Sequence, residues 1–98
     1  MGYSKWTEER HKEAIILEKA RKDFPPMVDD DGCASVDDLV FKALCELDLM
    51  LEQPEEYDYM TKAEFRSFKG QIKRYIKKYS KYVSNKGLKK ALARERLI

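Results

Sequence analysis

The stretch from Ser35 to Leu51 constrains the fold of this chain more than any other, because it is apolar on several sides. As a helix it would place seven apolar residues on one stripe at steps of three and four: Val36, Leu39, Val40, Ala43, Leu44, Leu47 and Leu51. The opposite side mixes charged residues with Phe41, Cys45 and Leu49. Such a helix needs partners on more than one face, so we expect the other segments to pack around it as a small bundle.

Turn residues divide the rest of the chain into helical segments. The periodicity and punctuation predict helices at about residues 7–22, 36–52, 62–84 and 87–96. Thr7 is the expected start of the first helix, the two prolines after Phe24 end it, and Pro54 ends the second. The 98 residues therefore predict one all-α domain, a small helical bundle of three main helices plus a short C-terminal helix.

The third helix should open with a capping box, in which Thr61 and Glu64 cap each other's backbone. Its expected buried stripe is apolar and aromatic: Phe65, Phe68, Ile72, Tyr75, Ile76, Tyr79, Tyr82 and Val83. Gly70 would cost this helix about 1 kcal/mol relative to Ala and would permit a close helix crossing. We expect Asn85 to Gly87 to end the helix.

Charge is distributed very unevenly along the chain. Residues 23–61 hold twelve acidic side chains and one basic one, whereas residues 62–98 hold thirteen basic side chains and two acidic ones. This pattern indicates either two surfaces for two partners, or two regions that neutralise each other within the fold or between copies in a homo-oligomer.

The basic face of the C-terminal half is the leading candidate for a binding surface. A row of cations opposite a buried stripe can follow a phosphate backbone, and Lys outnumbers Arg, which favours phosphate contact over base reading. We therefore expect nucleic-acid binding of low sequence specificity, against the alternative of a solvated Lys-rich face. The candidate nucleic-acid-binding residues are Lys62, Arg66, Lys69, Lys73, Arg74, Lys77, Lys78, Lys81, Lys89 and Lys90. Tyr75, Tyr79 and Tyr82 could stack on bases, although their spacing favours the core.

Two other kinds of binding protein remain open. The acidic segment from Asp23 to Asp58 could recognise a larger protein, either by meeting a basic groove or by imitating the charge of a nucleic acid. A small molecule or nucleotide could also be held between basic helices of an oligomer, although no spacing identifies one. Mobility-shift assays against duplex DNA, single-stranded DNA and RNA would separate the first idea from the second.

Nothing in the sequence indicates an enzyme. His11 is the sole histidine, and no phosphate-binding loop or nucleophile motif is present. The acidic turn does not match an EF-hand loop, because Met27 stands where an acidic first ligand is required and Asp38 stands where a bidentate Glu is required. A weak, hydrated Mg²⁺ site at Asp29 and Asp31 stays open, but a solvated turn is favoured, so we expect no metal and no cofactor.

The cysteines and the hydropathy indicate where a chain like this works. Cys33 and Cys45 match no metal or redox spacing, and we expect reduced thiols, with Cys45 buried as a small hydrophobe. The N-terminal segment is charged where a signal peptide would be apolar, and no apolar run approaches the roughly 20 residues of a membrane span. We therefore expect a cytoplasmic protein that does not enter a membrane.

The run from Thr61 to Leu92 resembles the tails of small helical proteins encoded by bacteriophages and prophages. The resemblance rests on Phe68-Lys69-Gly70-Gln71-Ile72 followed by Lys86-Gly87-Leu88, about a third of the chain. It implies a phage accessory protein that acts on host nucleic acid, or that inhibits a host defence or transcription protein during host takeover. The resemblance assigns no residue a role, and it adds weight to protein–protein interaction.

Overall fold

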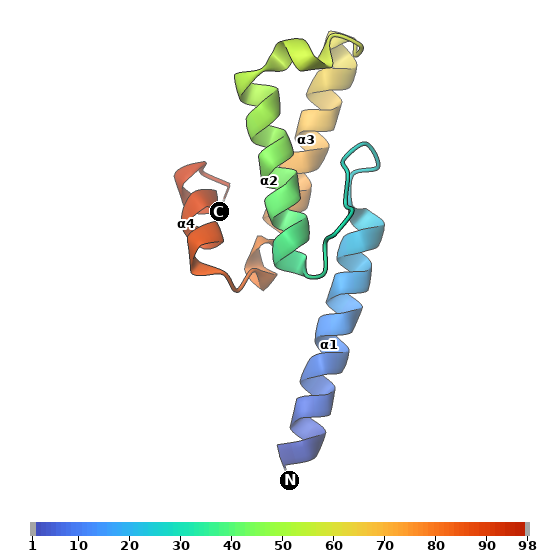
Figure 1. Cartoon of the computed structure of the whole chain (residues 1–98), viewed down its shortest axis with the longest axis vertical. Coiled ribbons are helices and arrows are strands. Elements are labelled where there is room, and N and C mark those ends of the chain that lie inside the picture. The colour runs from blue at the N-terminus through green and yellow to red at the C-terminus, as the bar shows by residue number, and fades with distance from the viewer. Residues whose placement is uncertain (1, 98) are drawn as a thin grey trace.

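The computed structural model describes residues 2–97, with the backbone alone for residues 2–7. Four α-helices follow one another, α1 (Gly2–Asp23), α2 (Val36–Glu52), α3 (Lys62–Tyr79) and α4 (Lys86–Arg94), with short 3₁₀ helices η1 (Pro54–Tyr57) and η2 (Ser80–Tyr82) on either side of α3. The described residues contain no strand. The predicted all-α class is therefore confirmed (Figure 1).

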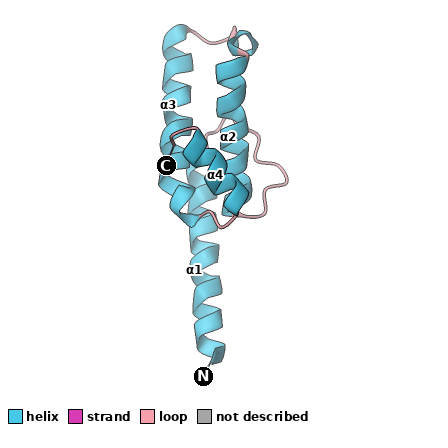
Figure 2. Cartoon of the chain, turned by 90° about the vertical axis from the view of Figure 1, so that its left-hand side faces the viewer, coloured by secondary structure: helices cyan, strands magenta, loops and turns pink. Residues whose placement is uncertain are grey.

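Helices α2 and α3 run antiparallel and lie side by side in both views, joined at one end by η1 (Figures 1 and 2). Their facing sides form most of the core, which holds Leu39, Val40, Ala43, Leu44, Leu47 and Met50 from α2 and Phe68, Ile72, Tyr75, Ile76 and Tyr79 from α3. The capping box predicted at the start of α3 is confirmed: Glu64 N donates to Thr61 Oγ1, and Thr61 N donates to Glu64 Oε1.

Helix α2 has partners on more than one side, since α1, α3, α4, η1 and η2 all contact it, but its outer side is not covered. Phe41 is 55% exposed, and Cys45 and Leu49 are exposed beside it. Leu51, predicted to be in the core, is also exposed, and Met50 is buried in its place. Around the helix Leu51 lies between Val40 and Leu44, which are both buried, so its exposure comes from its place on the last turn of α2 and not from its rotation. Burial of Cys45 was likewise a wrong prediction.

Among the described side chains of α1, those that pack against the core lie toward its C-terminal end. Ala20 and the following Phe24 are buried, Leu17 is partly buried, and every side chain from Glu8 to Ile15 is exposed. The N-terminal part of α1 projects away from the other helices (Figure 1). The helix begins at Gly2, so Thr7 lies within it and not at its start; the Thr7 side chain is outside the described residues.

Helix α3 is shorter than predicted, and α4 begins where a stop was expected. After Tyr79 the chain tightens into η2, and Val83 is extended. The Asp37 carboxylate of α2 then accepts hydrogen bonds from Ser84 N, Ser84 Oγ and Asn85 N. Asn85 caps α4 by accepting from Leu88 N at 2.9 Å, which makes Asn85 to Gly87 the beginning of a helix. The carboxylate on α2 therefore fixes where the chain turns into α4.

Candidate nucleic-acid interface

Five cations form a narrow strip along one side of α3, next to its buried face. They follow one another at steps of four, three, four and four residues: Lys62, Arg66, Lys69, Lys73 and Lys77. At 100° per residue these positions fall within about 80° of the helix circumference, and at 1.5 Å per residue they extend over about 22 Å. All are exposed except Lys69, which is half-buried. We call these five residues the α3 strip.

The first part of the strip borders a hollow between η1 and α3. Lys62, Arg66, Lys69 and Lys73 line it on one side, and its volume is about 710 Å³. Its other walls are the apolar and aromatic side chains Pro54, Tyr57, Met60 and Phe65, together with Asp58. The sequence pattern did not foresee these walls, because η1 joins two helices whose packing had to be known first. The hollow offers cations beside flat, apolar surface.

A second hollow, of about 310 Å³, continues the strip toward the C-terminal end of α3. Lys73, Arg74, Lys77, Arg96 and Leu97 line it. Lys73 belongs to both hollows, so they follow one another along the same helix. Arg96 was not among the predicted site residues, because it lies beyond α4 and nothing in its local sequence points toward α3.

The remaining predicted cations are not part of this arrangement. The Lys78 ammonium donates to Asp23 Oδ2 at 2.7 Å, and Lys81 lies over the ring of Tyr82, 5.2 Å from its centroid. Lys89 and Lys90 are exposed on α4 and line neither hollow. The predicted set thus divides into six residues that the fold brings together, the strip and Arg74, and four that it places elsewhere.

The ion pairs of the described residues leave the strip uncompensated. They are Lys22 with Glu18 at 3.6 Å and Lys78 with Asp23 at 2.7 Å. The hydrogen bonds from Lys78 and Tyr79 hold the pKa of the Asp23 carboxyl below its usual value, and the same carboxylate raises the pKa of Lys78. None of the strip cations takes part in either pair.

Two of the three tyrosines considered for base stacking are in the core. Tyr75 is buried and donates to the Ala20 carbonyl at 2.9 Å, and Tyr79 is buried and donates to Asp23. Stacking on these two rings is therefore excluded, while Tyr82 is 41% exposed. Burial, followed by a hydrogen bond to Glu46, raises the pKa of Tyr57. Tyr57 is therefore a neutral wall of the first hollow.

At Gly70 the space beside the backbone of α3 is taken by the side chain of Arg74 from the same helix, and not by another helix. A Cβ at Gly70 would be 3.4 Å from Arg74 Nη1, and the other atom within 4 Å also belongs to Arg74. The predicted close helix crossing at Gly70 is therefore wrong. The guanidinium of Arg74 instead covers the bare backbone at the edge of the first hollow, since Gly70 lines that hollow.

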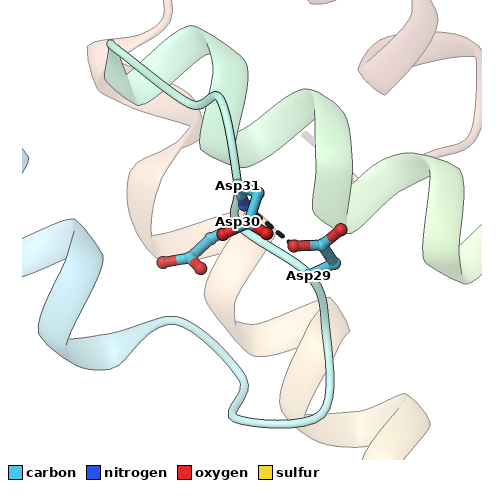
Figure 3. Close-up of side chains that lie close together, drawn as sticks. All are labelled: Asp29, Asp30 and Asp31. Carbon is cyan, nitrogen blue, oxygen red and sulfur yellow. Dashed lines mark hydrogen bonds between the residues drawn. The ribbon is translucent and has the colours of Figure 1, made fainter.

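The acidic turn before α2 holds three carboxylates close together. Ligand oxygens of Asp29, Asp30 and Asp31 lie within 4.8 Å of one another, and all three residues are exposed (Figure 3). Asp31 N donates to Asp29 Oδ1 at 2.9 Å, which is the geometry of an Asx turn. Gly32 follows at φ 81°, in agreement with the predicted turn. The Asx turn and the left-handed Gly32 account for the close approach of the three carboxylates.

The other candidate groups are scattered. His11 is exposed on the projecting part of α1, Cys33 is half-buried and Cys45 is exposed, and both thiols are free. Burial is the main cause that raises the pKa of each thiol. No helix within the described residues has the length and apolar character needed to cross a bilayer.

Comparison with known proteins found no matching family model, no matching curated protein and no matching solved structure.

Proposed function

We propose that this protein binds nucleic acid without strong sequence preference, by laying a phosphate backbone along the α3 strip. The observation that carries the proposal is five cations on one 80° face, bordering two hollows that share Lys73, with no carboxylate partner among the described residues. Four of the five are lysines, which contact phosphates as point charges and read bases poorly.

The length of the strip suits several consecutive phosphates. Phosphates in one strand of a duplex follow at about 3.4 Å of helix axis, but the strand winds around that axis, so a straight strip of about 22 Å meets a few consecutive phosphates. Of the aromatic walls of the first hollow, Tyr57 is buried and the half-buried Phe65 is the ring that offers surface for an unpaired base, and stacking there would contribute about 1–3 kcal/mol per base. Asp58 at the rim opposes phosphate there, so Asp58→Asn is expected to strengthen binding.

Fluorescence anisotropy with labelled duplex DNA, single-stranded DNA and RNA at several salt concentrations tests the proposal. The logarithm of the affinity should fall linearly with the logarithm of the salt concentration. The slope should be about −0.9 per neutralised phosphate on duplex DNA and about −0.7 on single strands. The triple variant Lys69→Glu, Lys73→Glu and Lys77→Glu should lose binding.

The matched control makes the same charge change on α4, with Lys86→Glu, Lys89→Glu and Lys90→Glu, three exposed lysines outside both hollows. The control should retain most of the affinity. Absence of binding by the unaltered protein at low salt, or an equal loss in the two triple variants, would contradict the proposal.

A protein partner is a second candidate, and the exposed face of α2 favours it. Phe41, Cys45 and Leu49 recur at steps of four on a solvent-facing helix side with Asp48 and Glu52, and Phe41 is 55% exposed. Such an acidic, partly apolar helix face suits a basic groove on a larger protein, as the resemblance to phage-encoded proteins implies. Affinity capture from cells, with and without nuclease, compares the unaltered protein with Phe41→Ser/Leu49→Ser. A protein that is still captured after nuclease treatment, but not by the double variant, would support this candidate. Identical capture by the unaltered protein and the double variant would reject it.

A further inference from the structure

The chain leaves α4 through a turn in which an arginine occupies a backbone conformation suited to glycine. Leu97 N donates to the Leu92 carbonyl at 2.9 Å and Arg96 N donates to the Ala93 carbonyl at 3.0 Å, which together form a Schellman motif. The residue at the left-handed position of this motif is most often Gly. Here it is Arg96, at φ 58°, the sole non-glycine residue with positive φ among those described.

The conformation of Arg96 is costly and its surroundings add to the cost. A side chain in the left-handed region is less stable than glycine by about 1–2 kcal/mol. The turn also brings the arginine to the hollow lined by Lys73, Arg74 and Lys77, where no lining residue is acidic. The four cations around this space of about 310 Å³ are all exposed, so water and salt screen their repulsion, and an anion between them would remove what remains of it.

The position of the turn is nevertheless well determined. Leu97, immediately after Arg96, is half-buried and packs against the core, and Leu92 is fully buried. The apolar contact that accompanies a Schellman motif therefore fixes the backbone on both sides of Arg96. The side chain is carried to α3 by the fold, and not by a flexible C-terminal tail.

We propose that Lys73, Arg74, Lys77 and Arg96 form a seat for a phosphate group, with Arg96 contributed by the turn after α4. The proposal rests on the proposed function insofar as the phosphate belongs to a nucleic-acid strand that follows the α3 strip. An arginine fork can hold two phosphate oxygens at once, which the lysines of the strip cannot do. The seat would therefore fix the register of a strand that the strip alone holds loosely.

The substitution Arg96→Gly tests the seat without endangering the fold, because glycine is the preferred residue at this position. The thermal midpoint should be unchanged or higher. Affinity for labelled nucleic acid should fall, and the slope of log affinity against log salt should decrease in magnitude by about 0.7–0.9, the value of one lost phosphate contact. Arg96→Asn, which also tolerates the left-handed region, should behave in the same way.

Arg94→Asn is the matched control, because Arg94 is an exposed arginine two residues earlier that does not line the hollow. It should leave affinity and salt slope nearly unchanged. If Arg96→Gly binds as tightly as the unaltered protein, or if Arg94→Asn loses as much as Arg96→Asn, the seat is overturned while the proposed function of the strip stands.

A separate titration with inorganic phosphate distinguishes the two sources of the anion. Perturbation of the Arg96 side-chain NMR signals by phosphate, but not by chloride at equal ionic strength, supports the seat even if no nucleic acid binds; it would then serve a free phosphate or phosphorylated small molecule. Failure of both nucleic acid and phosphate to perturb Arg96 overturns the seat. Failure of nucleic acid alone overturns the proposed function and leaves the seat.

Discussion

Helices α2 and α3 are of nearly equal length and pack along each other, yet their charged side chains are used differently. Carboxylates of α2 and its flanking segments bind within the fold: Asp37 holds residues 84–85, Asp38 accepts from Ala34 N, and Glu46 accepts from Tyr57. The cations of the α3 strip form none of the ion pairs found in the described residues. Three carboxylates of the acidic half thus bind within the fold, whereas the α3 strip of the basic half stays available for the external anion that we propose.

The largest expected effect concerns the buried faces of α2 and α3, in which the two helices are alike. Leu44→Asp places an unpaired carboxylate in the core, where Leu44 is 5% exposed, and should unfold the protein. A domain of this size is stable by only about 5–15 kcal/mol, and large-to-small core changes alone cost about 2–5. Circular dichroism and sizing provide the measurement. The matched control is Leu51→Asp on the same helix, 50% exposed, which should change the free energy of unfolding by less than about 0.5 kcal/mol.

The second expected effect concerns the acidic side of the comparison. Asp37→Ala removes the acceptor for Ser84 N, Ser84 Oγ and Asn85 N, and should lower the free energy of unfolding by about 1.5–3 kcal/mol. Urea unfolding measures the loss, and hydrogen exchange should show it concentrated in α4. Asp48→Ala, half-buried on the same helix, is the control. Equal losses in the two variants would mean that Asp37 does not act as a specific clamp.

Sequence periodicity correctly predicted the features that depend on residues within a few helical turns of one another. The stripe from Leu39 to Leu47 and the capping box of Thr61 and Glu64 are local patterns, and both occur in the structure. The end of α3 could not be predicted in this way, because Asp37 lies 47 residues before the Ser84 backbone that it binds. Nothing within α3 itself shows that the chain must turn before Asn85.

The candidate site was partly predictable for the same reason. Lysines at steps of three and four identify the strip directly. Two other features depend on tertiary packing. Lys78 is hydrogen-bonded to Asp23, 55 residues away, and Arg96 reaches the C-terminal end of the strip. The spacing of Tyr75 and Tyr79 suited both a core position and base stacking. Their hydroxyl groups donate to acceptors at the end of α1, which is consistent with the core position.

A smaller effect, of opposite sign, is expected on the basic side. Gly70→Ala should stabilise α3 by about 0.5–1 kcal/mol, raising the thermal midpoint by about 3–6 °C, because the new Cβ meets only the flexible end of Arg74 at 3.4 Å. Gly87→Ala is the control, since its Cβ would lie 3.2 Å from Asn85 Oδ1, the oxygen that caps α4, and no gain is expected there. A lower midpoint for Gly70→Ala would show that the space beside Gly70 is filled by more than Arg74. If affinity for nucleic acid falls while stability rises, the bare backbone at Gly70 is part of the binding hollow.

The smallest expected effect is a pH dependence at the ion pair between Asp23 of the acidic region and Lys78 of the basic region. The pKa of the Asp23 carboxyl is lowered in the folded protein, mainly by the hydrogen bond from Lys78 and then by that from Tyr79. A lowered folded-state pKa contributes stability that is fully present above the unfolded value of about 3.9 and is lost as pH falls through the folded value. Because both partners are substantially exposed, the contribution is modest and screened by salt.

Urea midpoints measured from pH 6 down to pH 2 should therefore fall less steeply for Asp23→Asn than for the unaltered protein. Lys78→Met should flatten the same part of the curve, whereas Lys77→Met, one position earlier on the exposed strip, should not. Equal flattening by the two lysine variants would show that Lys78 is held no more closely than the cations of the strip, and the division between charges that build the fold and charges left for a ligand would then not hold at Lys78.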